Sequence, residues 1–175
     1  MLPYFFILFG AILRVLPHAA NFAPIGALAL FGGVYLNKKI ALILPILTMI
    51  ISDFFIGFDS LESRLVIYGS FLIIGLIGLL IRNHKNVFTV TGGSLLGSTV
   101  FYLITNCVLF YSTKMYPHTW AGQMLSYTNA LPFFRATLGS DLFYTAVLFG
   151  SYELVKYFHH AYQGQSANSF VTRKN

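Results

Sequence analysis

The fold is decided by one stretch of the chain, which reads Arg14-Val-Leu-Pro-His-Ala-Ala-Asn-Phe-Ala-Pro-Ile-Gly-Ala-Leu-Ala-Leu-Phe-Gly-Gly33. Two prolines, an arginine, a histidine and an asparagine interrupt an otherwise apolar segment. Pro17 and Pro24 lack a backbone donor and disfavour helix at the residue before them, so irregular chain is predicted between the two prolines. At membrane depth, non-helical backbone is tolerated only where protein or a water-filled cavity covers it. The stretch is therefore predicted to form a wall of a binding cavity.

The composition of the chain is that of a membrane protein. Hydrophobic residues make up 57% and charged residues only 9% of the 175 residues, and the mean hydropathy is +0.72. A soluble domain of this composition would lack the polar surface that it needs. Because a spanning helix takes about 20 residues, the chain has room for about six spans. The net charge of +6 comes from basic residues in short loops, which is typical of topology control rather than of nucleic-acid binding.

The chain is predicted to be an all-α integral membrane protein of six transmembrane helices joined by short loops. Glycines and serines in the fifth span are small enough to let helices approach closely. Residues 1–160 are expected to form the transmembrane domain, and residues 161–175 a polar cytoplasmic tail that is disordered from Gln163. The predicted spans are residues 2–16, 24–36, 40–58, 65–81, 87–111 and 134–157.

The distribution of lysine and arginine predicts the orientation. In a six-span arrangement one side carries Lys38, Lys39, Arg82, Lys85, Lys156, Arg173 and Lys174, and the other carries Arg14, Arg64, Lys114 and Arg135. The side that is richer in lysine and arginine should be cytoplasmic, which places both termini inside and the loops after the first, third and fifth spans outside.

The outer loops include an aromatic segment, residues 116–134. Trp120, Met124, Tyr127 and Leu131 recur in it at helical spacing, which predicts an amphipathic helix on the outer surface. Two interpretations remain open, an aromatic anchor in the membrane interface and a lid over a cavity. As a lid, this segment would meet residues 17–24 over the outer mouth of the bundle and gate it.

Ionisable residues inside the predicted spans are the strongest indication of function, because such groups are costly in a membrane. At about 1.5 Å per residue, Asp53 lies roughly 8 Å and Asp141 roughly 10 Å below the outer span ends. Arg14, Arg135 and Asn106 lie near the outer rim. These groups suit either structural ion pairs or a polar pocket, and their convergence on one leaflet favours a pocket. At least one of the arginines is expected to pair with one of the aspartates.

Catalytic and metal-binding signatures are absent from the sequence. It contains no HExxH, GxSxG or GxxxxGK[ST] motif, so it lacks the signatures of a zinc protease, a serine hydrolase and an ATP-binding loop. His18 and His118 are expected to be ordinary surface histidines, and Cys107 a packed side chain that could otherwise ligate a metal in a bound solute. No resident cofactor is expected. The candidate ligand-binding residues are Arg14, His18, Asn21, Asp53, Asn106, Trp120, Tyr127, Arg135 and Asp141.

A set of motifs extends over nearly the whole chain: Pro17 to Gly33, Ser52-Asp53, Asn106, Tyr116-Pro117, Thr119 to Gly122, Pro132 to Arg135, Gly139 and Asp141. Together these motifs resemble an uncharacterised family of bacterial membrane proteins assigned to transport. In length and six-span architecture that family is in turn similar to the substrate-binding S components of energy-coupling-factor (ECF) vitamin transporters. The resemblance implies a location in the bacterial inner membrane, and a ligand bound in the outer half of an S-component-like bundle, under the loops after spans one, three and five.

The resemblance also implies a partner. S components carry an Ala-x-x-x-Ala face for the coupling subunit of an energising ATPase module, and Ala19, Ala23 and Ala27 have that spacing. The predicted function is therefore a membrane binding and uptake component for a small organic solute such as a vitamin. Its expected partners are the solute, the lipid bilayer and an ECF-type ATPase module, without nucleic acid. Two alternatives stay open: a membrane-embedded enzyme that uses Asp53 and Asp141 as acid and base, and a non-catalytic assembly subunit.

Overall fold

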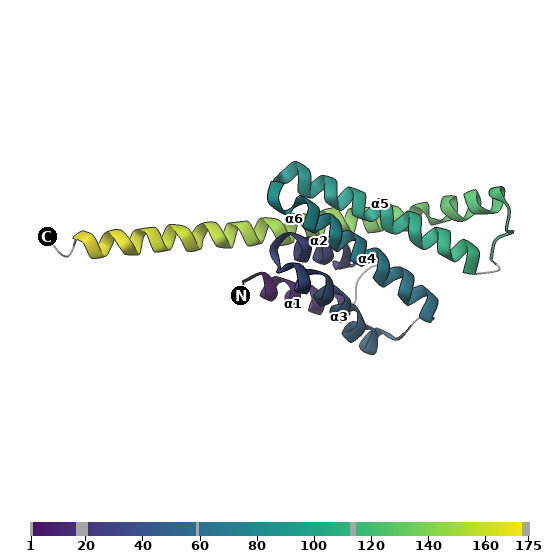
Figure 1. The fold of residues 1–175 in the computed structure, drawn as a ribbon, viewed down its shortest axis with the longest axis horizontal. Coiled ribbons are helices and arrows are strands. Elements are labelled where there is room, and N and C mark those ends of the chain that lie inside the picture. The colour runs from purple at the N-terminus through teal and green to yellow at the C-terminus, as the bar shows by residue number, and fades with distance from the viewer. Residues whose placement is uncertain (1, 17–20, 59, 113–114, 173–175) are drawn as a thin grey trace.

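The computed structural model of the protein describes residues 2–16, 21–58, 60–112 and 115–172. All regular secondary structure in these ranges is helical, which confirms the predicted all-α class (Figure 1). A short 3₁₀ helix, η1 (Arg82–His84), follows α4. The α-helices are α1 (Leu2–Val15), α2 (Ile25–Tyr35), α3 (Lys38–Ile56), α4 (Leu61–Ile81), α5 (Val87–Ser112) and α6 (Trp120–Thr172).

Three helical segments of the described chain are long and apolar enough to cross a membrane. They are α3, α4 together with η1, and the Val87–Val108 part of α5. Helices α1 and α2 are apolar but shorter, with 14 and 11 residues. Helix α6 is long, but its apolar part is diluted by polar and charged side chains such as Arg135, Asp141 and Glu153. By length and composition, the candidate membrane-spanning helices therefore lie in the middle of the chain.

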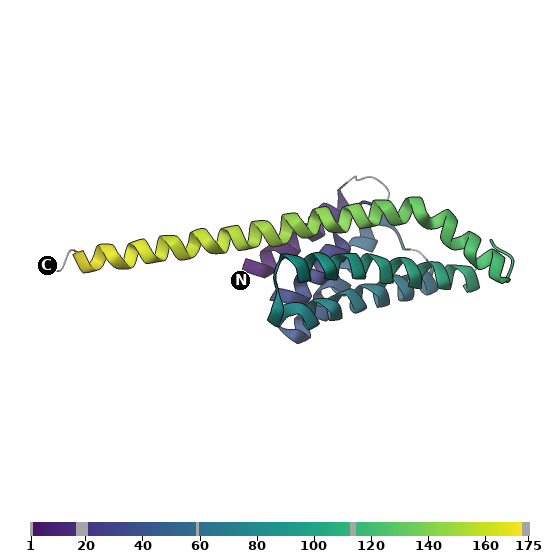
Figure 2. The ribbon, with the colours of Figure 1, turned by 90° about the horizontal axis from the view of Figure 1, so that it is seen from above.

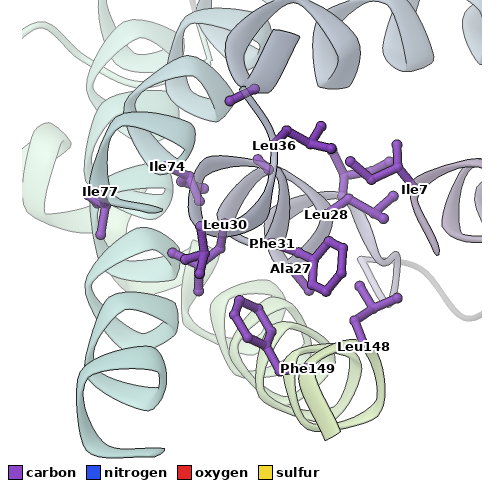
Figure 3. Close-up of a cluster of buried hydrophobic side chains, with 14 of the residues drawn as sticks. Ile7, Ala27, Leu28, Leu30, Phe31, Leu36, Ile74, Ile77, Leu148 and Phe149 are labelled. Atoms are coloured by element: carbon purple, nitrogen blue, oxygen red, sulfur yellow. The ribbon is translucent and has the colours of Figure 1, made fainter. Parts of the chain in front are cut away.

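The centre of the bundle is the short helix α2. Ten of its 11 residues, Ile25 to Val34, are buried, as expected for a helix that is apolar on every side. Side chains of α4 and α6 close around it in Figure 3, where Phe149 lies beside Phe31. The Phe31 and Phe149 rings meet edge to face with centroids 5.2 Å apart, a favourable aromatic geometry. The part of the interrupted stretch that follows Pro24 thus supplies the innermost helix of the fold.

Helices α2 and α4 touch at their backbones. A Cβ atom added to Gly33 would lie 2.3 Å from the carbonyl oxygen of Gly75 and 2.8 Å from Cα of Gly78. Only glycine permits so close an approach, which is how helices commonly pack inside membranes. The glycines at this crossing therefore fix the position of α2 in the bundle.

Helix α6 differs from the sequence prediction, which separated an outer helix over residues 116–134 from a span that begins at 134. The structure joins the two into one helix with Pro132 inside it. The helix bends in the same region (Figure 2), and proline is the usual cause of a bend because it removes a helical hydrogen bond without ending the helix. The residues from Gln163, predicted to be disordered, continue α6 as far as Thr172 and beyond the bundle.

Candidate functional site

A cavity of about 320 Å³ lies where the start of α4, the end of α5 and the bent part of α6 meet. We call it the α4–α5–α6 cavity. It sits at the end of the bundle that the charge pattern predicts to face outward. Its lining residues are Asn21, then Ser63, Val66 and Ile67 from α4, Phe101, Tyr102, Thr105, Asn106 and Val108 from α5, and Ala130, Phe133, Phe134 and Thr137 from α6.

Two of the predicted site residues, Asn21 and Asn106, line this cavity. Asn21 has a positive φ of 59°, a left-handed conformation that asparagine adopts more readily than most residues. Asn106 donates from Nδ2 to the carbonyl oxygen of Tyr102 at 2.8 Å. One amide of the wall therefore comes from the interrupted stretch and one from α5. The position of Asn21 agrees with the prediction that the interrupted stretch borders a cavity.

Arg14 and Asp53 form an ion pair away from the cavity. Arg14 Nη2 lies 2.8 Å from Asp53 Oδ1, and the two side chains are 13% and 10% exposed. Arg14 also donates to the carbonyl oxygen of Met49, and Tyr68 donates its hydroxyl to Asp53 Oδ2. The prediction that an arginine pairs with an aspartate is confirmed. The pair joins α1, α3 and α4, and neither of its members lines the cavity.

Asp141 lies on another side of the bundle, at the start of α2. Its carboxylate is 4% exposed and accepts from the backbone N–H of Ala27 and from Ser98 Oγ at 2.6 Å. A carboxylate beside unpaired N–H groups at a helix N-terminus acts as a cap and is stabilised by the helix dipole. Gly26 makes room for it, since a Cβ atom there would lie 2.3 Å from Asp141 Oδ1.

This arrangement predicts how substitutions at position 141 behave. Asp141→Asn should keep a folded protein, because asparagine caps a helix as well as aspartate does. Asp141→Leu should lower the thermal midpoint, since it leaves the buried backbone N–H of Ala27 without its acceptor at a cost of about 1–3 kcal/mol. Thermal unfolding in detergent, followed by size-exclusion chromatography, measures both variants. Equal losses for the two variants would show that the charge matters and the cap does not.

The ionisable residues that were predicted to share one polar pocket thus lie at separate sites. Asp53 and Asp141 have different partners on different helices. An acid–base pair of the two therefore finds no support in the contacts of the described residues. Arg135 is exposed and does not line the cavity. Depth along a helix can be counted from the sequence, but the direction in which a side chain points around the helix decides which groups meet.

The aromatic segment reaches the cavity with other residues than those predicted. Trp120 is 74% exposed and does not line the cavity. Tyr127 packs against Tyr102, with ring centroids 5.5 Å apart, and so supports the wall from behind. Phe133 and Phe134 are the lining rings. Asn21 borders the same cavity, so a gate formed by residues 17–24 and 116–134 stays a prediction. His18, which was also predicted to bind the ligand, lies outside the described residues, as do the other residues between 17 and 20.

Sequence reasoning missed Tyr68, Ser98 and the cavity hydroxyls. Thr105 and Thr137 each bond to the carbonyl oxygen four residues earlier, a pattern that looks in sequence like ordinary polar residues of a membrane helix. The only available signal was their position: Thr105 precedes Asn106, and Thr137 lies two residues after Arg135.

A second, larger cavity of about 410 Å³ lies between α1 and α3. Apart from Thr48, Ser52 and the Tyr4 hydroxyl, its lining is apolar, with Ile7, Leu8 and Phe55 among the members. It offers few polar groups to orient a ligand, which small-molecule sites normally have. Within the described residues no group of three or more His, Cys, Asp or Glu side chains could hold a metal ion.

Comparison with known proteins places the chain in a family but not in a functional class. The model of DUF6580, a family of unknown function, matches residues 1–164. No curated protein and no solved structure matches the chain. The family match includes every residue of the α4–α5–α6 cavity and both buried aspartates.

Proposed function

We propose that this chain, which belongs to the family of unknown function DUF6580, is a membrane-embedded binding and uptake component for a small organic solute. The observation that carries the proposal is the α4–α5–α6 cavity. Its volume of about 320 Å³ falls in the range of small-molecule sites, and its mixture of apolar, aromatic and a few amide and hydroxyl groups is typical of them.

The proposal includes a six-span bundle in the bacterial plasma membrane with both termini in the cytoplasm. In this bundle each of the six α-helices supplies one span, and α6 packs along α5 and α2. The shorter α1 and α2 lie within the membrane, where α2 is shielded by protein. In this orientation the cavity opens toward the outside, as uptake requires.

The orientation gives a direct prediction. A reporter enzyme that is active only in the cytoplasm, fused after Asn175, should be active. The physical reason is the excess of lysine and arginine in the loops on that side. A periplasm-specific reporter at the same position serves as the control. Activity of the periplasmic reporter instead would invert the bundle and place the cavity on the wrong side for uptake.

The proposal does not include docking of an ATPase module through the alanine face that the resemblance implies. In the S-component resemblance Ala27 belongs to the face that would dock the coupling subunit, but Ala27 is only 1% exposed and belongs to the hydrophobic core. Ala19 lies outside the described residues. We therefore restrict the proposal to solute binding and uptake, and an energising module would have to contact another face.

Cysteine labelling tests the proposal. Cys107 is the single cysteine, so Cys107→Ser gives a background in which Thr137→Cys places one thiol on the cavity wall. A membrane-impermeant maleimide added to intact cells should label it, because the cavity opens outward. Small molecules extracted from rich growth medium should slow that labelling several-fold by occupying the cavity.

Met115→Cys provides the matched control. Met115 lies before α6 at the same end of the bundle, is 71% exposed and does not line the cavity. Its labelling should be fast and unaffected by the extract. Protection of both positions would indicate a non-specific effect, and protection of neither would contradict solute binding in this cavity.

A further inference from the structure

We infer that the solute is an uncharged, planar molecule that presents hydrogen-bond donors to the walls of the α4–α5–α6 cavity. This inference rests on the proposed function and adds the chemical class of the substrate. Three features of the cavity carry it: the charge of the lining, the hydrogen-bonding state of its polar side chains and the placement of its aromatic rings.

The lining carries no formal charge. None of the described residues around the cavity is Asp, Glu, Lys, Arg or His. The two acids that the prediction assigned to a ligand already have partners: Asp53 is paired with Arg14, and Asp141 accepts from Ser98 and from the Ala27 N–H. A carboxylate or an ammonium group in this cavity would lose its hydration without gaining an opposite charge, which costs far more than burial of a neutral polar group. The cavity therefore selects against ions of either sign.

The polar side chains of the α5 and α6 walls present lone pairs. Tyr102 donates its hydroxyl hydrogen to the carbonyl oxygen of Tyr127 at 2.7 Å. The hydroxyls of Thr105 and Thr137 donate to backbone carbonyls at 2.8 and 3.0 Å. Each of these groups has spent its only hydrogen, so what it can still offer a ligand is an acceptor lone pair.

Asn106 adds another acceptor to this wall. One N–H of its Nδ2 group donates to the Tyr102 carbonyl oxygen, and a carbonyl oxygen can only accept, so the assignment of the amide nitrogen to that contact is fixed by chemistry. The side-chain oxygen of Asn106 is left as an acceptor, and its second N–H is left as a donor. A ligand that matches Tyr102, Thr105 and Thr137 must supply N–H or O–H groups, because an acceptor placed against any of these hydroxyls would leave both groups unpaired.

Phe101 and Phe134, two of the lining rings, are held by neighbouring rings. Phe101 stacks on Phe71 with centroids 5.2 Å apart and 29° between the planes. Phe134 packs against Tyr102 with centroids 4.6 Å apart. Rings that are fixed by a neighbour offer a pre-arranged flat or edge surface, and such surfaces favour another planar group. Donor groups on a flat, neutral framework therefore complement this cavity best.

Four small aromatic probes test the inference: benzamide, N,N-dimethylbenzamide, benzoate and benzylammonium. Ligand-observed NMR on the protein in lipid nanodiscs should show that benzamide binds about threefold to tenfold more tightly than each of the other three probes. Thr137→Val and Thr105→Val, which remove an acceptor and keep the shape, should each weaken benzamide by a similar factor, the equivalent of one neutral hydrogen bond. The dimethylated amide should not respond to either substitution.

Ala130→Phe distinguishes failure of this inference from failure of the proposed function. It places a phenyl ring inside the cavity, so binding of any probe that occupies the cavity should be lost or strongly weakened. If benzoate or benzylammonium binds tightest and Ala130→Phe abolishes that binding, the cavity is a solute site and the inferred class is wrong. If no probe binds, or if binding is the same in wild type and Ala130→Phe, both the class and the site are overturned.

Discussion

Replacing Gly33 by alanine should prevent α2 from reaching its place in the bundle. The added Cβ atom would lie 2.3 Å from the Gly75 carbonyl oxygen and 2.8 Å from Cα of Gly78. Both obstacles are backbone atoms, so no side chain can turn aside and the two helices must separate. Overpacking of a core typically costs about 1–3 kcal/mol, and more where the backbone has to move. We expect loss of most monodisperse protein in detergent, as measured by fluorescence-detected size-exclusion chromatography.

Gly92→Ala is the matched control for this prediction. Gly92 also lies inside a helix, but a Cβ atom there meets nothing within 4 Å. Because alanine favours helix over glycine by up to about 1 kcal/mol, the variant should be at least as stable as the wild type. Normal yield and thermal midpoint for Gly33→Ala would show that α2 and α4 are not packed at their backbones.

Breaking the Arg14–Asp53 ion pair should be the second large effect. Arg14→Met leaves the Asp53 carboxylate largely buried beside Tyr68 without its cation. Removal of one partner of a buried pair costs about 3–5 kcal/mol, because the remaining charge is uncompensated. We expect a strongly lowered thermal midpoint in nanodiscs. Tyr68→Phe removes one hydrogen bond to the same carboxylate and should cost about 1.5–3 kcal/mol.

The double variant Arg14→Met with Asp53→Leu separates the charge effect from lost packing. It buries no unpaired charge, so it should recover much of the stability that Arg14→Met loses. Additive losses in the double variant would mean that the two side chains do not interact. A normal midpoint for Arg14→Met alone would remove the pair from the structural account.

The helix positions could be predicted from the sequence for physical reasons that are local. Runs of apolar residues between charged loops indicated both ends of α3 and α5 to within two residues, and Pro24 indicated the start of α2. The fourth span was predicted to begin at Leu65, but α4 begins at Leu61, because Ser60 caps it by accepting from the backbone N–H of Ser63. The continuity of α6 could not be predicted in this way. Pro132 lies between two apolar stretches, and a proline either ends or bends a helix according to what packs around it.

The candidate site was predictable only in part. Charge complementarity predicted that at least one arginine pairs with one of the two aspartates, and the structure shows which pair forms, Arg14 with Asp53. The role of Asp141 depended on where α2 begins in space, because its partners include the backbone of Ala27. The hydroxyls of Thr105 and Thr137 gave no signal, since the orientation of a helix around its own axis decides whether such a group faces a cavity.

Native mass spectrometry of the protein purified from its membrane, beside Ala130→Phe and Leu131→Phe, tests the central claim most directly. Ala130 lines the cavity, whereas Leu131 is 42% exposed and does not, so the two variants add the same ring inside and outside the site. The account predicts a small bound molecule in the wild type and in Leu131→Phe that is absent from Ala130→Phe. A folded wild type without any bound small molecule, or one retained equally by both variants, would contradict solute binding in the α4–α5–α6 cavity.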